Sequence, residues 1–261
     1  MPTLRHVRKK PMLSSAGQLT EIALARRLAR EAGSLLRQLR ENGAHEGRAL
    51  GDAGDREAND FLLNALAIER PDDAVLSEES VDDGKRFTAQ RVWIIDPLDG
   101  TREYREGRDD WAVHVALVAR GEVIAAAVAQ PMRDEVFDST TVALTSDPQR
   151  VIVVSRSRPP ALSADIARAL HARIEPVGSA GAKALVVVRG DALAYVHEGG
   201  LNEWDAAAPL GVALAHGLHV SDLQGRAIVF NQRDVVLHGG LVLCRPECAA
   251  AILAITKNTS S

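Results

Sequence analysis

The residues best suited to chemistry lie in the stretch WIIDPLDGTREY, residues 93–104. An apolar run ends in Asp96, and Asp99 follows three residues later across a turn that contains Pro97. Two buried carboxylates aimed at one point raise each other's pKa unless a cation neutralises them. Because oxygen-only ligands favour a hard ion over zinc, the stretch predicts a site for Mg²⁺ or Mn²⁺.

The same stretch offers groups that would complete a metal and phosphate site. The Leu98 carbonyl, between the two aspartates in sequence, can add a neutral oxygen ligand. Gly100 and Thr101 would supply backbone N–H groups at an expected helix start, which is a phosphate-binding arrangement.

Further acidic candidates stand elsewhere in the chain. Glu78 and Glu79 follow the apolar segment AVLS, and Asp205 would open an apolar helix. Taken singly, each has a simpler explanation. Asp205 suits a helix N-cap, the glutamate pair suits a solvated loop, and D-x-x-D is common in turns.

The elements that must position these residues follow from apolar spacing. Helical periodicity predicts helices over 18–40 and 53–69, separated by a break over 41–52. Expected strands are AVLSEES, RVWIID, a hairpin of WAVHVALV with VIAAAVAQP, and DEVFDS.

The pattern changes at the turn-rich segment SDPQR, residues 146–150. Beyond it, the strands VIVVS, RIEPV, ALAYVHE and GLVLC alternate with expected helices at 163–172, 180–188, 204–216 and 246–256. This alternation predicts an α/β lobe over 149–261, which would carry Asp205 and the specificity residues. It would follow an α+β lobe over 1–148 that carries most of the metal ligands.

Composition limits the classes of partner. The chain has 261 residues, 46% of them apolar, with a net charge of −4 and 3% aromatic residues. We therefore expect neither a nucleic-acid polymer nor a membrane as partner. No apolar run approaches the ~18 residues of a membrane span, and the expected location is cytoplasmic. Cys244 and Cys248 are expected to be reduced thiols.

In combination, the acidic motifs form a pattern that is specific to one protein family. E-E, then DPLDGT, then WD at a late helix resembles the signature of the inositol monophosphatase-like family of metal-dependent phosphatases, over nearly the whole chain. The resemblance implies a layered αβαβα sandwich of the α/β (α+β) class and a homodimer. It also implies two or three Mg²⁺ ions per active site, with Mn²⁺ able to substitute, and inhibition by Li⁺.

The resemblance also implies roles for individual residues. The first metal would be held by Glu78, Asp96 and the Leu98 carbonyl. The second would be held by Asp96, Asp99 and Asp205, and a third ion would be reached by Glu79 through water. Two metals about 3.5–4 Å apart suit an in-line phosphoryl displacement by a metal-activated water.

In addition to Glu78, the resemblance assigns catalytic roles to Thr101 and Asp55. Thr101, polarised by Asp55 in GDAGDREAND, would position the attacking water and help accept its proton. The simpler interpretation of Asp55 is a charge at a helix end. Many family members carry a lysine in the preceding loop. ENGAHEGRAL has none, so that role is absent or taken by Arg48.

The residues expected to contact the rest of the substrate point to two different classes of phosphatase. The expected substrate-binding residues are Asp99, Gly100, Thr101, Lys183, Glu198 and Asp205. Lys183 stands where CysQ-type 3′-phosphoadenosine-5′-phosphate phosphatases have a lysine, although a helix-surface role is an alternative. The SRSRPP turn resembles the same enzymes, so Arg156 or Arg158 could meet a distal phosphate.

Two features point toward inositol monophosphatases instead. Glu198 stands where those enzymes contact ring hydroxyls, and His197 replaces an arginine typical of CysQ-type enzymes. The stretches LSEESVDDG, GRDDWAVHVAL and GSAGAKA are most similar to actinobacterial CysQ-type sequences. We therefore expect hydrolysis of the 3′-phosphate of 3′-phosphoadenosine 5′-phosphate to AMP.

Two alternatives stay open. The first is an inositol monophosphatase, with or without fructose-1,6-bisphosphatase activity. The second is a catalytically silent relative that only binds a metal or nucleotide, against which the intact acidic set argues. The histidines at 114, 216 and 219 are expected to be structural.

Overall fold

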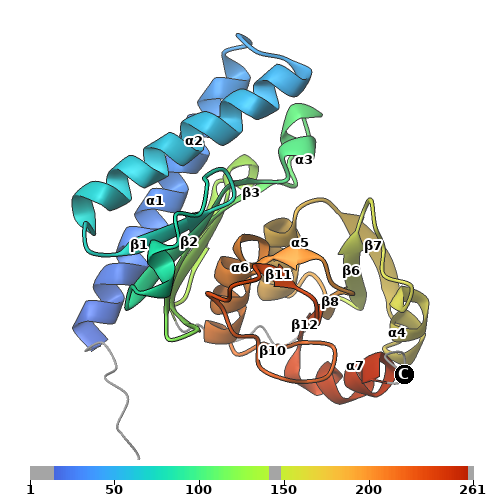
Figure 1. Ribbon diagram of the computed structural model, residues 1–261. Helices are drawn as coiled ribbons and strands as arrows, with labels where there is room; N and C mark the ends of the chain where they lie inside the picture. Colours follow the sequence, from blue (N-terminus) through green and yellow to red (C-terminus); the bar gives the residue numbers. More distant parts are fainter. Residues whose placement is uncertain (1–14, 141–147, 258–261) are drawn as a thin grey trace, which may run out of the picture.

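Five layers of secondary structure make up this protein, seen in a computed structural model that describes residues 15–140 and 148–257 (Figure 1). The layers alternate between helices and sheets. Two helices cover the outer face of a first sheet, two lie between the sheets, and two cover the outer face of a second sheet. The predicted αβαβα sandwich is confirmed.

The first layer consists of α1 (Ser15–Glu41) and α2 (Gly47–Glu69). The break predicted over 41–52 is wrong for most of its length, because α2 already begins at Gly47. Gly51 lies inside this helix and serves close packing. A Cβ at Gly51 would lie 2.9 Å from Thr101 Cγ2. The glycine therefore lets α2 approach the segment that carries the predicted catalytic threonine.

The first sheet has the order β1-β2-β3-β4-β5. Its strands are β1 (Ala74–Ser77), β2 (Arg91–Asp99), β3 (Ala112–Ala119), β4 (Glu122–Gln130) and β5 (Glu135–Asp138). β1 runs parallel to β2, and the other pairs are antiparallel, including the predicted β3–β4 hairpin. The short helix α3 (Thr101–Arg105) follows β2 directly.

β2 is buried on both faces, which explains its unbroken apolar run. Trp93 and Ile95 pack among α1 and α2, whereas Val92 and Ile94 pack toward the middle helices. The apolar run stops at Asp96, where the register with β3 shifts between Asp96 and Asp99. This irregularity places both carboxylates at the end of a fully buried strand.

The second sheet has the order β10-β12-β8-β6-β7. Its strands are β6 (Val151–Ser155), β7 (Arg173–Val177), β8 (Ala194–His197), β10 (His219–Ser221) and β12 (Leu241–Cys244). β6 runs parallel to both β7 and β8, so the carboxyl ends of these three strands share one edge. A small separate sheet pairs β9 (Leu201–Asn202) with β11 (Val236–Leu237).

The later helices complete the layers. They are α4 (Ser163–Ala169), α5 (Ala180–Arg189), α6 (Glu203–Ala215) and α7 (Ala249–Thr256). Short 3₁₀ turns are η1 (Lys85–Phe87), η2 (Pro131–Arg133) and η3 (Pro246–Cys248). α5 and α6 share one apolar core with both sheets, while α4 and α7 pack on the outer face of the second sheet.

The strands of the two sheets fall on either side of residue 148, the predicted lobe boundary. α6 nevertheless packs against β2, β3 and β4 of the first sheet. The division into two lobes stays a prediction. The turn predicted over 146–150 lies partly outside the described residues. Within the described ranges, no helix is both long and apolar enough to cross a membrane.

Candidate active site

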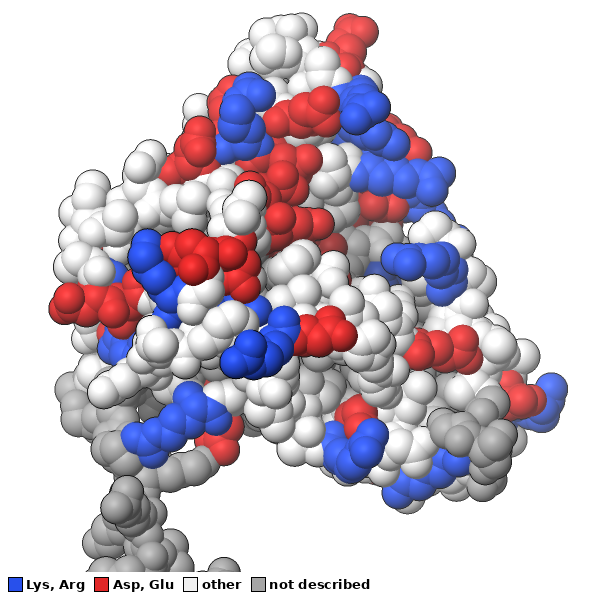
Figure 2. Space-filling model, in the orientation of Figure 1, with Lys and Arg blue, Asp and Glu red and all other residues white. Residues whose placement is uncertain are grey.

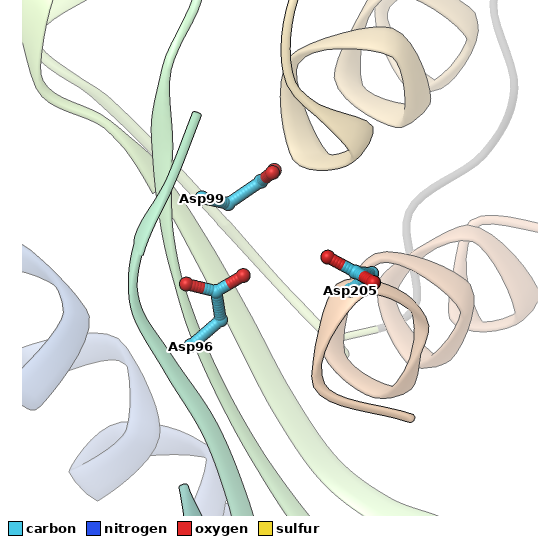
Figure 3. A group of neighbouring side chains, drawn as sticks. All are labelled: Asp96, Asp99 and Asp205. Atoms are coloured by element: carbon cyan, nitrogen blue, oxygen red, sulfur yellow. The ribbon is translucent and has the colours of Figure 1, made fainter. Parts of the chain in front are cut away.

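Three aspartates converge where β2 meets the amino-terminal end of α6. Asp96 and Asp99 come from β2 and Asp205 from α6, and their carboxyl groups point into the space between strand and helix (Figure 3). One oxygen from each lies within 4.8 Å of the others. The structure thus brings together three of the predicted metal ligands, from segments more than a hundred residues apart.

Asp96 is the most deeply buried of the three, with 1% of its surface exposed. Its Oδ1 accepts a hydrogen bond from Leu98 N at 3.1 Å, but Oδ2 has no hydrogen-bond partner among the described residues, and His114 Nδ1 lies 3.9 Å from it. Burial, together with the charges of Glu78 and Asp99, raises the Asp96 pKa well above its usual range. A buried, unpartnered carboxylate oxygen facing other carboxylates fits a divalent cation.

Asp99 is held in place by the amino-terminal end of α5. Ala180 N donates to Oδ1 at 3.2 Å and Gly181 N donates to Oδ2 at 2.6 Å. His114 Nε2 lies 3.1 Å from the same Oδ2. Although burial alone would raise the Asp99 pKa, His114 and the Gly181 N–H lower it. This carboxylate therefore stays charged while its neighbours favour protonation.

Asp205 is the third residue of α6, not its N-cap. Its Oδ2 accepts a hydrogen bond from Asn202 N at 2.6 Å, as one half of a capping box in which Asn202 is the N-cap. Burial and the charge of Asp99 raise the Asp205 pKa to about 6. The carboxylate thus fixes the helix start and faces the aspartates of β2.

Glu78 reaches the site because β1 is parallel to β2. Ser77 pairs with Ile95 in the register, and Glu78 N donates to Ile95 O at 3.4 Å. The residue is partly exposed, and burial of its carboxyl end together with the charge of Asp205 raises its pKa to about 7. Glu79 follows it in an exposed turn.

Thr101 and Asp55 make the predicted contact. Thr101 Oγ1 lies 3.1 Å from Asp55 Oδ1 and 3.2 Å from the Leu98 carbonyl oxygen. Burial, and next the charge of Glu79, raises the Asp55 pKa to about 7. The preceding Gly100 has φ +91°, and a Cβ there would lie 2.9 Å from Ser179 Cβ. Only glycine fits this turn without strain.

Lys183 is not a helix-surface residue. Only 3% of its surface is exposed, and its ammonium group donates to the carbonyl oxygens of Gly178 and Ser179, the latter at 2.6 Å. The ammonium also lies 5.2 Å from the centre of the Tyr195 ring. Burial lowers the Lys183 pKa to about 8. One of its three donors is left for a ligand.

The carboxyl ends of β6 and β8 bring together other predicted specificity residues. Arg156 is tied to Glu103 at 2.6 Å and to Glu106 at 3.1 Å. Arg158 is exposed and makes no side-chain hydrogen bond or ion pair within the described residues. Its positive charge acts to lower the pKa values of Tyr195 and His197.

Glu198, by contrast, is already engaged. Its Oε1 accepts a hydrogen bond from Leu162 N at 3.2 Å, which ties it to the loop that follows Arg158. The neighbouring His197 is buried, and burial together with the Lys183 charge lowers its pKa to about 4. The uncharged imidazole therefore stands where an arginine was expected from the CysQ-type pattern.

Sequence reasoning missed two residues beside the site. His114 is buried, as expected, but it also contacts Asp99, and its Nδ1 lies 3.0 Å from the Trp204 carbonyl oxygen. A signal existed, because a histidine interrupts an apolar strand directly opposite Asp96. The Tyr195 hydroxyl is buried without a hydrogen-bond partner in the part of the chain that the structure describes.

The other polar candidates have local roles. His216 Nδ1 lies 2.8 Å from Val212 O, and His219 Nε2 lies 3.0 Å from Ser221 Oγ. Cys244 and Cys248 are buried free thiols. These residues make their contacts away from the aspartates of β2, so they supply nothing to the site.

The surface around the site is strongly charged. In Figure 2, acidic side chains gather in the upper middle of the face shown, and basic side chains alternate with them. The acidic run reaches the region where the two sheets face each other in the same orientation of Figure 1. A cation would be attracted to this face.

Known proteins resemble this chain over most of its length. The profile described as "Inositol monophosphatase family" matches residues 17–260. A Mycobacterium leprae (strain TN) protein named 3′-phosphoadenosine 5′-phosphate phosphatase is 50% identical over 257 residues, covering 92% of this chain and 94% of the relative. A protein of the same name from Mycobacterium tuberculosis is 49% identical over 236 residues, covering 85% and 88%.

More distant relatives agree with this match. The 3′(2′),5′-bisphosphate nucleotidase CysQ of Escherichia coli (strain K12) is 30% identical over 202 residues, covering 72% of this chain and 82% of the relative. Among solved structures, inositol monophosphatase-II from Staphylococcus aureus MSSA476 has a TM-score of 0.75 at 20% identity, covering 92% and 94%. That likeness bears on the fold alone, whereas the profile match over residues 17–260 shows that this chain belongs to the inositol monophosphatase family.

Proposed function

We propose that this protein is a Mg²⁺-dependent phosphatase that hydrolyses the 3′-phosphate of 3′-phosphoadenosine 5′-phosphate, giving AMP and phosphate. The observation that carries the chemistry is the convergence of Asp96, Asp99 and Asp205 around an unpartnered carboxylate oxygen. The substrate follows from relatives that are 49–50% identical and are named for this activity.

The residues that would hold two or three Mg²⁺ ions, or Mn²⁺ in their place, are Glu78, Asp96, Asp99, Asp205, the Leu98 carbonyl and, through water, Glu79. The donor set is made of oxygen atoms only, which suits these hard cations. Bound ions would supply neutralising charge and a lowered pKa for water.

The chain's own groups would orient the reactants. The backbone N–H groups of Gly100 and Thr101 would bind phosphate oxygens at the start of α3. The Thr101 hydroxyl can donate to Asp55 while its lone pairs accept a hydrogen bond from the attacking water. Because the Asp55 pKa is raised to about 7, this carboxylate can accept a proton near neutral pH.

The state of three side chains favours a bisphosphate over an inositol phosphate. Lys183 and Arg158 each keep a free donor near the carboxyl ends of β7, β6 and β8. Glu198, which would contact ring hydroxyls in an inositol monophosphatase, is hydrogen-bonded to Leu162 N. A second phosphate would therefore find cations, whereas inositol would find its glutamate engaged.

A substrate panel tests the proposal. Phosphate release is measured with Mg²⁺ for 3′-phosphoadenosine 5′-phosphate, inositol 1-phosphate and fructose 1,6-bisphosphate, and kcat/KM is compared. We expect the nucleotide to be preferred by at least about tenfold, the effect of one good polar contact. A preference for inositol 1-phosphate would support the alternative, an inositol monophosphatase. Absence of turnover with all three would support a silent binding protein.

We further propose, from the family resemblance, a cytoplasmic homodimer that Li⁺ inhibits. Light scattering after size-exclusion chromatography measures the assembly directly. A Li⁺ titration at fixed Mg²⁺ measures the inhibition. A monomer would leave the proposed chemistry intact, because the converging aspartates all belong to one chain.

A further inference from the structure

Two buried charged residues outside the proposed metal centre are hydrogen-bonded to the same turn. Glu203, which is fully buried, accepts hydrogen bonds from Asn231 N and Gln232 N, both at 2.7 Å. Arg86, 2% exposed, donates through Nη1 to Asn231 Oδ1 at 2.9 Å and to Gln232 O at 2.8 Å. Asn231 Nδ2 donates back to Arg86 O at 3.1 Å.

These contacts link the two segments that carry opposing metal ligands. Arg86 lies in η1 and closes the loop that begins at Glu78, because its Nε also donates to Asp82 at 2.7 Å. Glu203 is the first residue of α6, two residues before Asp205. The turn at 231–232 therefore joins the Glu78 loop to the helix that presents Asp205.

Such a link has a physical purpose. Carboxylates gathered at one point repel each other, so the segments that carry them need an attachment outside the cluster. A buried network whose groups are paired holds one geometry, and removing one partner leaves a costly buried charge. Both carboxylate oxygens of Glu203 are bonded, and Arg86 has partners on both of its donating edges.

We propose that Arg86 and Glu203 are positioning residues which, through the Asn231–Gln232 turn, set the separation of Glu78 from Asp205 and thereby the affinity for the divalent metal. The inference rests on the proposed metal centre, because Glu78 and Asp205 matter here as ligands. Partners of metal ligands commonly contribute ~10–100-fold to metal affinity.

Three variants test this link, and each removes a different part of its hydrogen bonding. Glu203→Gln keeps the size of the side chain but turns an amide NH₂ toward one of the two N–H donors. Arg86→Lys keeps the charge but loses the branched set of donors. Asn231→Gly removes only the side-chain bonds to Arg86, and glycine readily adopts the φ of +60° found there. If Glu203→Gln does not fold, the other two still decide the question.

The primary measurement is the Kd for Mn²⁺ by isothermal titration calorimetry on the full chain, with thermal unfolding alongside. We expect Glu203→Gln to raise Kd about 10–100-fold and Asn231→Gly to raise it less. kcat at saturating metal should stay within about threefold of wild type, because the reacting groups are untouched.

Glu21→Gln is the matched control. Glu21 is a buried glutamate bonded to Arg70 and Arg91, at the opposite end of β2 from Asp96. Asp96 follows Arg91 by five positions along the strand, a distance of roughly 17 Å. This control should lower Tm and leave Kd unchanged. If the three test variants also lower Tm without changing Kd, the positioning role is wrong.

The outcome for the wild-type protein separates the two proposals. Wild-type protein that binds no Mn²⁺ overturns the metal centre and the positioning role together. Wild-type binding with unchanged Kd in the variants overturns the positioning role alone.

Discussion

At the proposed metal centre, the surroundings of single side chains decide what each can do. Asp99 is surrounded by N–H groups and His114, whereas Asp96 keeps an oxygen with no hydrogen-bond partner in the described ranges. The two aspartates on this strand therefore differ in acidity: the pKa of Asp99 is lowered, and the pKa of Asp96 is raised. The difference favours a bound cation beside Asp96.

Replacing Asp96 by Asn tests this assignment. We expect metal-dependent turnover to fall by more than about 100-fold, beyond the usual effect of losing a ligand's partner. The metal-free variant should unfold at the wild-type temperature or higher, because asparagine requires neither a buried charge nor the uptake of a proton on folding. Phosphate release and circular dichroism melting measure the two effects. Asp165→Asn, at an exposed surface pair, is the control, and retained activity in Asp96→Asn would refute the ligand assignment.

Replacing Arg158 by Ala tests the distal-phosphate contact. We expect kcat/KM for 3′-phosphoadenosine 5′-phosphate to fall about 10–100-fold, the value of a charged hydrogen bond. Adenosine 3′-monophosphate, which lacks the second phosphate, should be unaffected. Arg156→Ala is the comparison, since Arg156 is tied to two glutamates. Equal losses on both substrates would show that Arg158 does not recognise the distal phosphate.

At the scale of elements, the site depends on how closely α2 and α5 approach β2 and α3. The amino-terminal end of α5 donates two N–H groups to Asp99, and α2 presents Asp55 to Thr101. Both approaches are close enough that a glycine stands at the contact, Gly51 on α2 and Gly100 before α3. The geometry of the proposed catalytic residues is therefore a property of helix packing.

Gly51→Ala should disturb this geometry without unfolding the protein. The added Cβ would lie 2.9 Å from Thr101 Cγ2, so Thr101 must move relative to Asp55. We expect kcat to fall about 10–100-fold, as small misplacements of catalytic groups do. Tm should change by less than about 5 °C, because alanine's higher helix propensity offsets the strain. Phosphate-release kinetics and melting curves measure both.

A second substitution supplies the control for Gly51→Ala. Thr101→Ser removes the clashing methyl group and keeps the hydroxyl. The double variant should therefore recover most of the activity that Gly51→Ala loses, relative to Thr101→Ser alone. No recovery would mean that the clash is not the cause.

At the scale of the whole molecule, the sandwich brings together acidic side chains from α2, the end of β1 and α6. Asp55 and Glu78 have pKa values raised to about 7, and Asp205 to about 6. Each value lies above the usual range near 4 of an unfolded chain, so the metal-free folded state binds more protons than the unfolded state. Its stability must fall as pH rises through this range.

We therefore expect the Tm of the metal-free protein to decrease from about pH 4 to pH 7, the interval between the unfolded and folded pKa values of these groups. Saturating Mg²⁺ should raise Tm more at pH 8 than at pH 5, because binding requires deprotonated carboxylates. Differential scanning calorimetry with EDTA or Mg²⁺ measures both trends. Asp205→Asn should flatten the metal-free dependence, and a Tm that rises with pH in EDTA would contradict the raised pKa values.

Sequence periodicity predicted most elements, because strands buried on two faces and amphipathic helices have distinct apolar patterns. The predicted start of α2 at residue 53 was wrong, because the segment from Gly47 lacks a clear apolar pattern and Gly51 is explained only by its contact with Thr101. The sequence also left open whether Lys183 binds substrate or lies on a helix surface. Its position on α5 is local information, but its burial depends on where α5 packs.

The sequence by itself determined the acidic motif and most of the order of helices and strands along the chain, whereas the layered sandwich followed from the family resemblance. DPLDGT is local, so its strand end and turn fix Asp96, Asp99 and Thr101 relative to one another. Only the tertiary structure decided that Glu198 binds Leu162, that His114 contacts Asp99, and that a turn at 231–232 links Arg86 to Glu203. These partners lie far apart in the chain, and packing of α5 and α6 between the sheets brings them together.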